Sequence, residues 1–246
     1  MCRMVVFKGE NNFGIELVKS LKKAARNDRF NNFKSHADGW GGIIMDENKE
    51  ILIKSIKPIY DENLDLFSTS SFIYGLLHAR KAAPNEPLIG PIDSHPFIIH
   101  SDNEIVYIAH NGWINKKVIG EKFNINYNLK NDSEVFAHLI EKFDGNIKER
   151  IMKAIEFTNE FALLGALNLL CIISGYDNKK NLCYYSKSKE NNIYYKLFKY
   201  EKNKNFAVMS STVAFEMGFI DENGNKLNTY IEEVPQNILF LDGKKW

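Results

Sequence analysis

Short apolar runs and polar turns alternate along the first quarter of the chain, and their period changes from strand-like to helical and back. Residues 4–7, MVVF, form an apolar run that predicts a short buried strand. Over residues 13–28 the apolar positions recur every three or four residues with polar residues between them, which predicts an amphipathic helix. Residues 39–56 then indicate a strand, a tight acidic turn and a second strand.

The central part of the chain continues with two further strands and two helices. A hydrophobic run over 71–82 ends in His-Ala-Arg, and residues 104–114 predict another buried strand that an Asn-Gly turn closes. Asp132 is the expected N-cap of a helix whose apolar positions over 135–143 fall on one stripe. Isoleucines at helical spacing over 147–155 predict a second helix.

From residue 161 onward the pattern is that of strands separated by Asn, Asp and Lys turns. Strands therefore occupy both ends of the chain and helices its middle. This order predicts two sheets with a helical layer, and the first strand is expected to lie inside a sheet. No linker rich in Pro, Gly or Ser divides the sequence, so we expect residues 1–246 to form a single domain.

Composition and charge exclude several classes of function. The net charge is +1, whereas proteins that bind nucleic acids through bulk electrostatics carry a basic stripe, so no nucleic-acid partner is expected. The most apolar stretch, residues 161–176, is shorter than the roughly 20 residues of a membrane span and contains Asn168, so it predicts core and no membrane association. No signal peptide is visible and the cysteines form no CxxC pair, which predicts a reducing, cytoplasmic location.

A cysteine at position two, directly before the first strand, introduces candidate chemistry. A small residue after Met1 is what removal of the initiator methionine requires, and removal would make Cys2 the first residue. Because thiols titrate near pKa 8.5 and α-amines near 7.7–8.0, a nucleophile and a matched base would then share one residue. By position alone Cys2 also fits a buried core residue, which is what Cys171 and Cys183 are expected to be within their apolar runs.

Further polar residues that could carry chemistry occur in five short stretches downstream. Each stretch is common when it stands alone, because Asn-Gly usually marks a turn, an Arg after a strand usually lies at the surface and NDSE is an ordinary capping sequence. The stretches are HADGWGG at 36–42, HAR at 78–80, SHPF at 94–97, AHNGW at 109–113 and NDSE at 131–134.

In this order, and together with Cys2, these stretches resemble the class II glutamine amidotransferases, which belong to the N-terminal-nucleophile hydrolases. The resemblance covers roughly residues 2–140 and is most specific in HARKAA, SHPF and AHNG. It is closest to the stand-alone branch with an N-terminal MCR, which lacks a fused synthase domain. The resemblance implies an α+β fold: a four-layer αββα sandwich of two antiparallel sheets between helical layers.

The resemblance also implies a role for each of five residues. Cys2 would attack the side-chain amide carbon of glutamine to form a γ-glutamyl thioester, release ammonia and leave the thioester to hydrolysis by water. Asn111 and Gly112 correspond to the pair that stabilises the oxyanion. Arg80 corresponds to the residue that binds the α-carboxylate of glutamine and Asp132 to the residue that binds its α-ammonium group. The ammonia would pass to a separate synthase subunit or be released.

The resemblance implies neither a metal nor an organic cofactor, and the histidines agree with that. They lie on separate segments without a paired ligand spacing such as HxxxH, so a zinc site has no support in the sequence. We expect His78, His95 and His110 to pack behind the site. Trp40 and Trp113 could line the pocket or belong to the core.

Two departures from the family pattern leave the substrate open. Ala83 stands where several relatives have a threonine that helps to hold the substrate carboxylate, and Asp93 precedes SHPF where an Asn is commoner. One alternative is a γ-glutamyl amide or peptide hydrolase, which would use the same nucleophile and clamp. The other alternative is a non-catalytic ligand-binding partner subunit. The retained thiol of Cys2 counts against it, because binding alone does not need a thiol.

Overall fold

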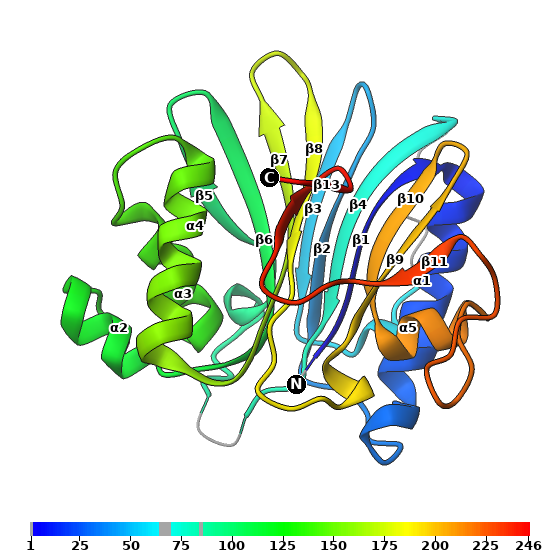
Figure 1. Cartoon of the computed structure of the whole chain (residues 1–246), viewed down its shortest axis with the longest axis horizontal. Coiled ribbons are helices and arrows are strands. Elements are labelled where there is room, and N and C mark those ends of the chain that lie inside the picture. The colour runs from blue at the N-terminus through cyan, green and yellow to red at the C-terminus, as the bar shows by residue number, and fades with distance from the viewer. Residues whose placement is uncertain (1, 64–69, 84–85) are drawn as a thin grey trace.

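The computed structural model describes residues 2–63, 70–83 and 86–246, and it consists of two antiparallel sheets packed face to face between helices (Figure 1). Met1, whose removal the sequence predicts, lies outside the described residues. The observed layers are those of the predicted αββα sandwich, with one group of helices on the outer face of each sheet.

The first sheet has seven strands in the order β11-β9-β10-β1-β4-β2-β3. The first strand pairs with β10 on one side and β4 on the other, so it lies inside the sheet as predicted. The strands are β1 Arg3–Glu10, β2 Trp40–Met45, β3 Glu50–Ser55, β4 Phe72–Ala79, β9 Leu197–Lys202, β10 Asn205–Ser210 and β11 Ile231–Glu233.

The second sheet has six strands in the order β13-β12-β8-β7-β6-β5. Its long central strand, β7, contains the apolar stretch expected to be core, and both downstream cysteines are fully buried in this sheet. Within the described part of the chain, no helix is apolar over a length sufficient to cross a membrane. The strands are β5 Phe97–His100, β6 Glu104–Ile114, β7 Leu163–Gly175, β8 Lys180–Tyr185, β12 Leu239–Leu241 and β13 Lys244–Lys245.

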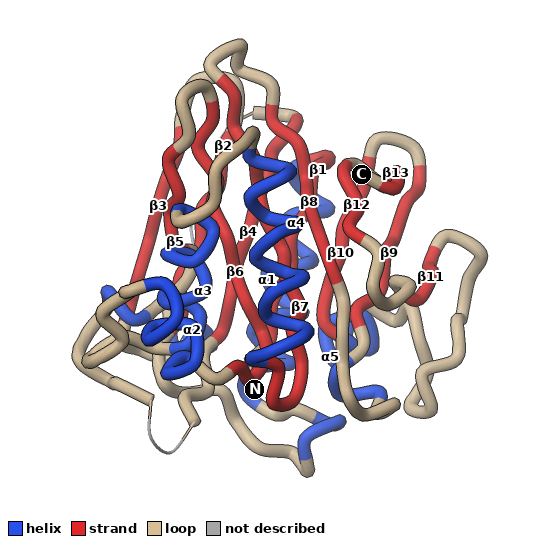
Figure 2. Tube along the Cα trace, turned by 60° about the vertical axis from the view of Figure 1, so that its left-hand side comes forward, coloured by secondary structure: helices blue, strands red, loops and turns tan. Residues whose placement is uncertain are grey.

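Among the described residues, five α-helices form the outer layers, and Figure 1 shows their separation into two groups. Figure 2, with the left-hand side turned forward, shows α4 in front of the strands. The seven-stranded sheet carries α1 Asn11–Arg26 and α5 Ser211–Glu216. The six-stranded sheet carries α2 Lys116–Phe123, α3 Asp132–Glu141 and α4 Ile147–Phe157. The sequence pattern did not predict α2 and α5, which have only eight and six residues and therefore show little helical periodicity.

The alternation of side chains along β1 explains how the layers hold together. Met4 and Val6 point into the apolar layer between the two sheets, whereas Val5 and Phe7 point toward α1, and all four are fully buried. A strand that is buried on both faces reads as a continuous apolar run, which is why MVVF carries no polar residue. Packing on both faces of β1 thus fixes the start of the chain.

Two local predictions were wrong, and both concern residues of the candidate active site described below. The Asn-Gly pair does not end a strand: β6 continues to Ile114, with Asn111 and Gly112 paired to β7 and a register shift after Gly112. The N-cap of α3 is Asn131, whose side chain accepts the N–H of Glu134 at 2.8 Å. Asp132 is instead the first helical residue, so its carboxylate is not used for capping.

Gly41 of β2 allows a close approach between this strand and the segment that precedes β5. A Cβ added at Gly41 would lie 2.0 Å from the backbone oxygen of His95. We expect Gly41→Ala to lower the free energy of unfolding by about 2 kcal/mol, because a backbone atom has to move. Gly165→Ala is the matched control: its added Cβ has no neighbour nearer than 3.5 Å, and its effect should stay within about 0.5 kcal/mol. Denaturant unfolding measures both, and equal stabilities would contradict the close approach.

Candidate active site

A cavity of about 440 Å³ opens beside the start of β1 and gathers four of the five predicted site residues. Cys2, Arg80, Gly112 and Asp132 line it, and Asn111 lies next to it in hydrogen-bond contact with Cys2. They come from the beginning of β1, the end of β4, the bulged end of β6 and the first turn of α3. Neighbouring strand ends of the two sheets thus bring together residues that lie far apart in the sequence, at the end of the molecule marked N in Figure 1.

Backbone and side-chain groups hold Cys2 at the cavity wall. Its backbone N–H donates to Oδ1 of Asn111 at 2.8 Å. Its Sγ accepts the backbone N–H of Lys81 at 3.3 Å and lies 3.5 Å from the backbone oxygen of Lys81. Cys2 is partly exposed, whereas Cys171 and Cys183 are fully buried, so Cys2 has the accessibility that a reactive thiol needs.

Asn111 and Gly112 are adjacent residues of β6 at a place where no larger pair of side chains would fit. Oδ1 of the buried Asn111 is taken by the N–H of Cys2, which leaves its Nδ2 amide group to donate to a ligand. A Cβ added at Gly112 would lie 1.9 Å from the backbone oxygen of Ala166 and 2.3 Å from Nε2 of His110. Only glycine fits here, because the neighbouring strand β7 approaches so closely.

Arg80 brings a buried cation to the cavity. Its residue is only 4% exposed, and its Nη2 donates to the backbone oxygen of Pro87 at 2.7 Å. Its backbone is fixed by hydrogen bonds with Gly39 and Asp38. Among the described residues, no carboxylate lies within ion-pair distance of this guanidinium. A buried arginine without a counter-ion favours an anionic ligand.

Asp132 brings the opposite charge. It is 9% exposed, and its Oδ2 accepts the backbone N–H of Ile114 at 3.2 Å. Its Oδ1 accepts the hydroxyl of Ser133 at 3.3 Å, and Oγ of Ser133 also contacts Nδ1 of His110. In the part of the chain that the structure describes, Asp132 has no ion-pair partner. Arg80 and Asp132 therefore bring a buried cation and a buried anion, each without an ion-pair partner among the described residues, to one cavity, and this charge pattern matches a zwitterion.

Directly after Cys2, a buried ion pair fixes the start of the chain. The guanidinium of Arg3 donates from Nε to Oδ2 of Asp28 at 2.5 Å, and both side chains are fully buried. The other end of this guanidinium donates to the backbone oxygens of Cys2 and Tyr194, each at 3.2 Å. Arg3 also lies 4.0 Å from the centre of the Tyr194 ring. This places a cation–π contact beside the ion pair.

The Asp28 carboxylate collects further donors. Nε2 of His36 contacts its Oδ2 at 2.7 Å, and the Thr212 hydroxyl donates to its Oδ1. Burial opposes ionisation of Asp28, but the hydrogen bond from His36 and the charge of Arg3 outweigh it and lower the Asp28 pKa to about 2. Burial lowers the His36 pKa to about 4, so His36 is neutral and donates its Nε2 proton to the carboxylate.

Of the three histidines expected to pack behind the site, His95 and His110 line the cavity itself, and His78 packs against His95. The rings of His78 and His95 are in contact, with their centres 3.8 Å apart, and His110 lies against Phe136. Burial lowers the pKa of all three imidazoles, for His78 and His95 well below the usual range, so they are neutral. His95 and His110 thus give the cavity wall uncharged rings.

The remaining sequence features have clear places in the structure. Trp40 belongs to the core and is 2% exposed, whereas Trp113 lines the cavity and is 57% exposed. Ala83 lines the cavity. Asp93 is the last residue of the short 3-10 helix Pro91–Asp93, and its Oδ2 accepts the backbone N–H groups of Ile89 and Gly90.

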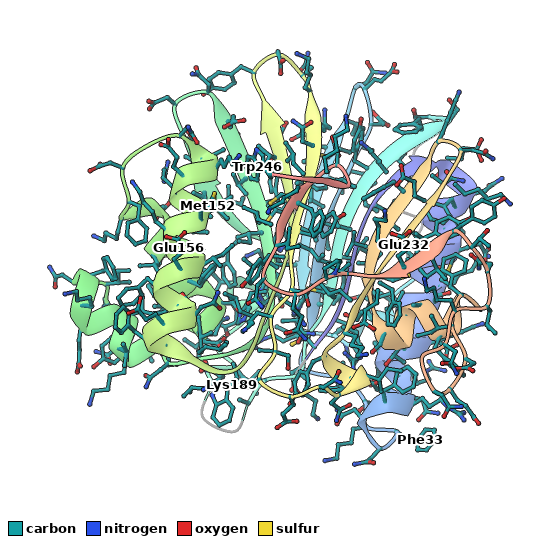
Figure 3. The ribbon with its side chains drawn as sticks, in the orientation of Figure 1. Phe33, Met152, Glu156, Lys189, Glu232 and Trp246 are labelled. Carbon is teal, nitrogen blue, oxygen red and sulfur yellow. The ribbon has the colours of Figure 1, made fainter. Side chains whose placement is uncertain are left out.

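Several lining residues were missed by sequence reasoning. Glu86 faces the cavity near Asp132, and its segment carries no helix or strand pattern that could have pointed to it. Asn31, Lys34, Tyr194 and Tyr195 line the same cavity. Figure 3 shows Phe33, next to Lys34, projecting from the loop after α1 at the edge of the molecule where the chain starts. Polar loop segments of this kind have no periodicity to interpret.

Comparison with known proteins gives relatives in one enzyme class. No protein-family model matches the chain. Two curated relatives, both named glutamine–fructose-6-phosphate aminotransferase [isomerizing], come from Streptococcus agalactiae serotypes V and III. Each is 29% identical over 174 residues, which are 67% of this chain and 27% of the relative. The chain therefore spans about a quarter of the length of these relatives.

Solved structures share the fold over nearly the whole chain. A glutamine phosphoribosylpyrophosphate amidotransferase from B. subtilis aligns with a TM-score of 0.63 at 15% identity, over 98% of this chain and 47% of that one. A structure described as the allosteric regulatory enzyme of purine biosynthesis aligns with 0.64 at 18% identity, over 97% and 46%. A class-II glutamine aminotransferase domain protein from Silicibacter pomeroyi aligns with 0.50 at 11%, over 97% and 94%.

The predicted resemblance and the predicted fold are thus both confirmed. The chain resembles the class II glutamine amidotransferases in sequence and in structure, and these relatives are enzymes. Its two antiparallel sheets with flanking helices form the same α+β sandwich as these solved structures.

The neutral state of His36 makes stability depend on pH. Between pH 7 and pH 5 the unfolded chain takes up a proton at His36, whose ordinary pKa is 6.5, whereas the folded protein, with a pKa of about 4, does not. Stability should therefore fall as the pH is lowered, with His36 contributing about 2 kcal/mol over this interval. Asp28, with a folded pKa of about 2 against 3.8, is ionised in both states here and adds nothing.

Denaturant unfolding at the two pH values measures this loss. His36→Gln should lose less free energy of unfolding between pH 7 and pH 5 than the parent protein. The other buried histidines contribute equally to the loss in both proteins. NMR titration of the His36 ring in the parent protein provides a second measurement. An imidazole that titrates near its ordinary pKa would contradict the buried network.

Proposed function

We propose that this chain is a glutamine amidohydrolase that uses Cys2 as an N-terminal nucleophile and releases ammonia from the side chain of glutamine. The observation that carries the proposal is the content of one cavity. It holds a partly exposed thiol, an amide donor beside that thiol, an unpaired guanidinium and an unpaired carboxylate. Amide hydrolysis of an α-amino acid needs a nucleophile, an oxyanion site and a group for each end of the zwitterion.

The proton transfers in this mechanism take place within one residue. After removal of Met1 the nitrogen of Cys2 is a free α-amine, which accepts the thiol proton directly or through a water molecule. The thiolate attacks the amide carbon of glutamine, and the α-amine then donates the proton to the leaving ammonia. Water hydrolyses the γ-glutamyl thioester, giving glutamate and the free thiol. The hydrogen bond to Oδ1 of Asn111 orients the amine for both transfers.

The negative charge that forms on the amide oxygen is assigned to Asn111 and Gly112. Because Oδ1 of Asn111 already accepts from the nitrogen of Cys2, its Nδ2 group is the donor available to the oxyanion. The backbone N–H of Gly112 is the second donor, at a position where the absence of a side chain allows close approach. Each donor of this type stabilises the transition state by roughly 3–4 kcal/mol.

The two unpaired charges form the substrate clamp of the proposal. Arg80 binds the α-carboxylate through its planar guanidinium, and Asp132 binds the α-ammonium group. A γ-glutamyl amide or peptide would present the same zwitterionic end to the same residues. Glutamine remains the proposed substrate, because the curated relatives are named for glutamine. The ammonia either passes to a separate synthase subunit or leaves into solution.

The first test concerns the nucleophile. The mass of the purified protein should be one methionine lower than that of the full sequence, and a diazo-ketone analogue of glutamine should alkylate Cys2. Cys171 and Cys183 should stay unmodified, because both are fully buried. Cys2→Ala should abolish labelling and turnover while keeping the thermal midpoint of the parent protein. A fully active protein that retains Met1 would refute the mechanism.

The second test separates the two functions of Asn111. Asn111→Asp keeps an oxygen that can accept from the Cys2 nitrogen but removes the amide donor. We expect kcat to fall by about 10²–10³ with little change in KM, because the donor acts mainly in the transition state. The rate of Cys2 alkylation by iodoacetamide serves as the control and should change much less than kcat. If kcat is unchanged in a folded variant, Asn111 is a structural strand residue only.

A further inference from the structure

A second carboxylate, that of Glu86, faces the same end of the cavity as Asp132. Both residues line the cavity, and the side chain of Glu86 is only 15% exposed. The backbone N–H of Glu86 donates to the backbone oxygen of Ala83 at 3.0 Å, which fixes the position of the Glu86 backbone. Its Oε2 lies 3.1 Å from Nζ of Lys116, the first residue of α2.

The ammonium group of Lys116 does not neutralise both the Glu86 and the Asp132 carboxylate at this end of the cavity. Its Nζ is shared, because it also donates to the backbone oxygen of Lys130 at 2.7 Å. Burial, and then the negative charge of Asp132, raise the pKa of the Glu86 carboxyl in spite of the contact with Lys116. Two carboxylates and one shared ammonium group leave a net negative charge, and a cationic group of a ligand would remove it.

We infer that Glu86 is a specificity residue that binds the α-ammonium group of the substrate together with Asp132. This inference rests on the proposed function, because it adds a second partner at the ammonium end of the same clamp. One carboxylate can hold an ammonium group by charge alone, whereas two carboxylates on different segments also fix its direction. The pair would reject ligands that have the carboxylate and side-chain amide of glutamine but no ammonium group.

A structural role for Glu86 has a different signature. In that case the ion pair with Lys116 would only join the segment after Ala83 to α2, and loss of either partner would have the same effect. Lys116→Met keeps the Glu86 carboxylate and removes its ion-pair partner. Glu86→Gln removes the charge and keeps the shape. Glu121→Gln is the matched control, since Glu121 also lies in an ion pair with a lysine of α2 but is exposed to solvent.

The experiment measures binding, so that it does not depend on turnover. In a Cys2→Ala background, calorimetry compares L-glutamine with 4-carbamoylbutanoate, which is glutamine without its amino group. We expect Glu86→Gln to weaken L-glutamine binding about tenfold and to leave binding of 4-carbamoylbutanoate unchanged. Lys116→Met and Glu121→Gln should retain the preference for L-glutamine.

Each other outcome contradicts the inference. An equal loss for both ligands, or the same loss in Glu86→Gln and Lys116→Met, would make Glu86 structural. Unchanged L-glutamine binding in Glu86→Gln, or no binding of L-glutamine to the Cys2→Ala protein, would also overturn it. A protein that binds L-glutamine through Glu86 but does not hydrolyse it when Cys2 is present would instead refute the proposed function and leave this inference standing.

Discussion

The buried carboxylate of Asp28 holds the start of the chain in place, and the geometry of the cavity depends on this contact. Four donors reach this carboxylate: the guanidinium of Arg3, the ring of His36, the hydroxyl of Thr212 and the backbone N–H of Phe30. A buried charge is stable only when it is paired and hydrogen-bonded in this way. Because Arg3 also donates to the backbone oxygen of Cys2, the ion pair fixes the residue that carries the thiol.

The sequence predicted the elements that depend on local periodicity. The strand at MVVF, the helix after it, the β2–β3 hairpin and the strands after residue 161 all follow from patterns within a few residues. The order of the short motifs predicted the αββα sandwich and four of the residues that line the cavity. That Cys2 and Asn111, 109 residues apart, belong to one site was implied by the resemblance and by no local pattern, and their hydrogen bond was not predicted.

The remaining features depend on contacts between distant segments. Asn-Gly usually forms a turn, but here it pairs with β7 and continues a strand, and only the neighbouring strand decides this. Asn131 and Asp132 are both good capping residues, so propensity alone cannot decide which of them caps α3. The Arg3–Asp28 pair and the position of Glu86 beside Asp132 depend on how loops pack, and loops have no period.

The position of β1 in the middle of its sheet has a consequence for the order of events during synthesis. Val5 pairs with Leu77 of β4 and with Met209 of β10, so one neighbour of the first strand is made only after about 200 further residues. At about 5–20 residues per second, roughly 10–40 s pass before that neighbour exists. During this interval the chain start lacks one of its two final strand partners and remains open to the enzymes that process new N-termini. The late closure of the sheet would thus leave time for the removal of Met1 that the proposed mechanism requires.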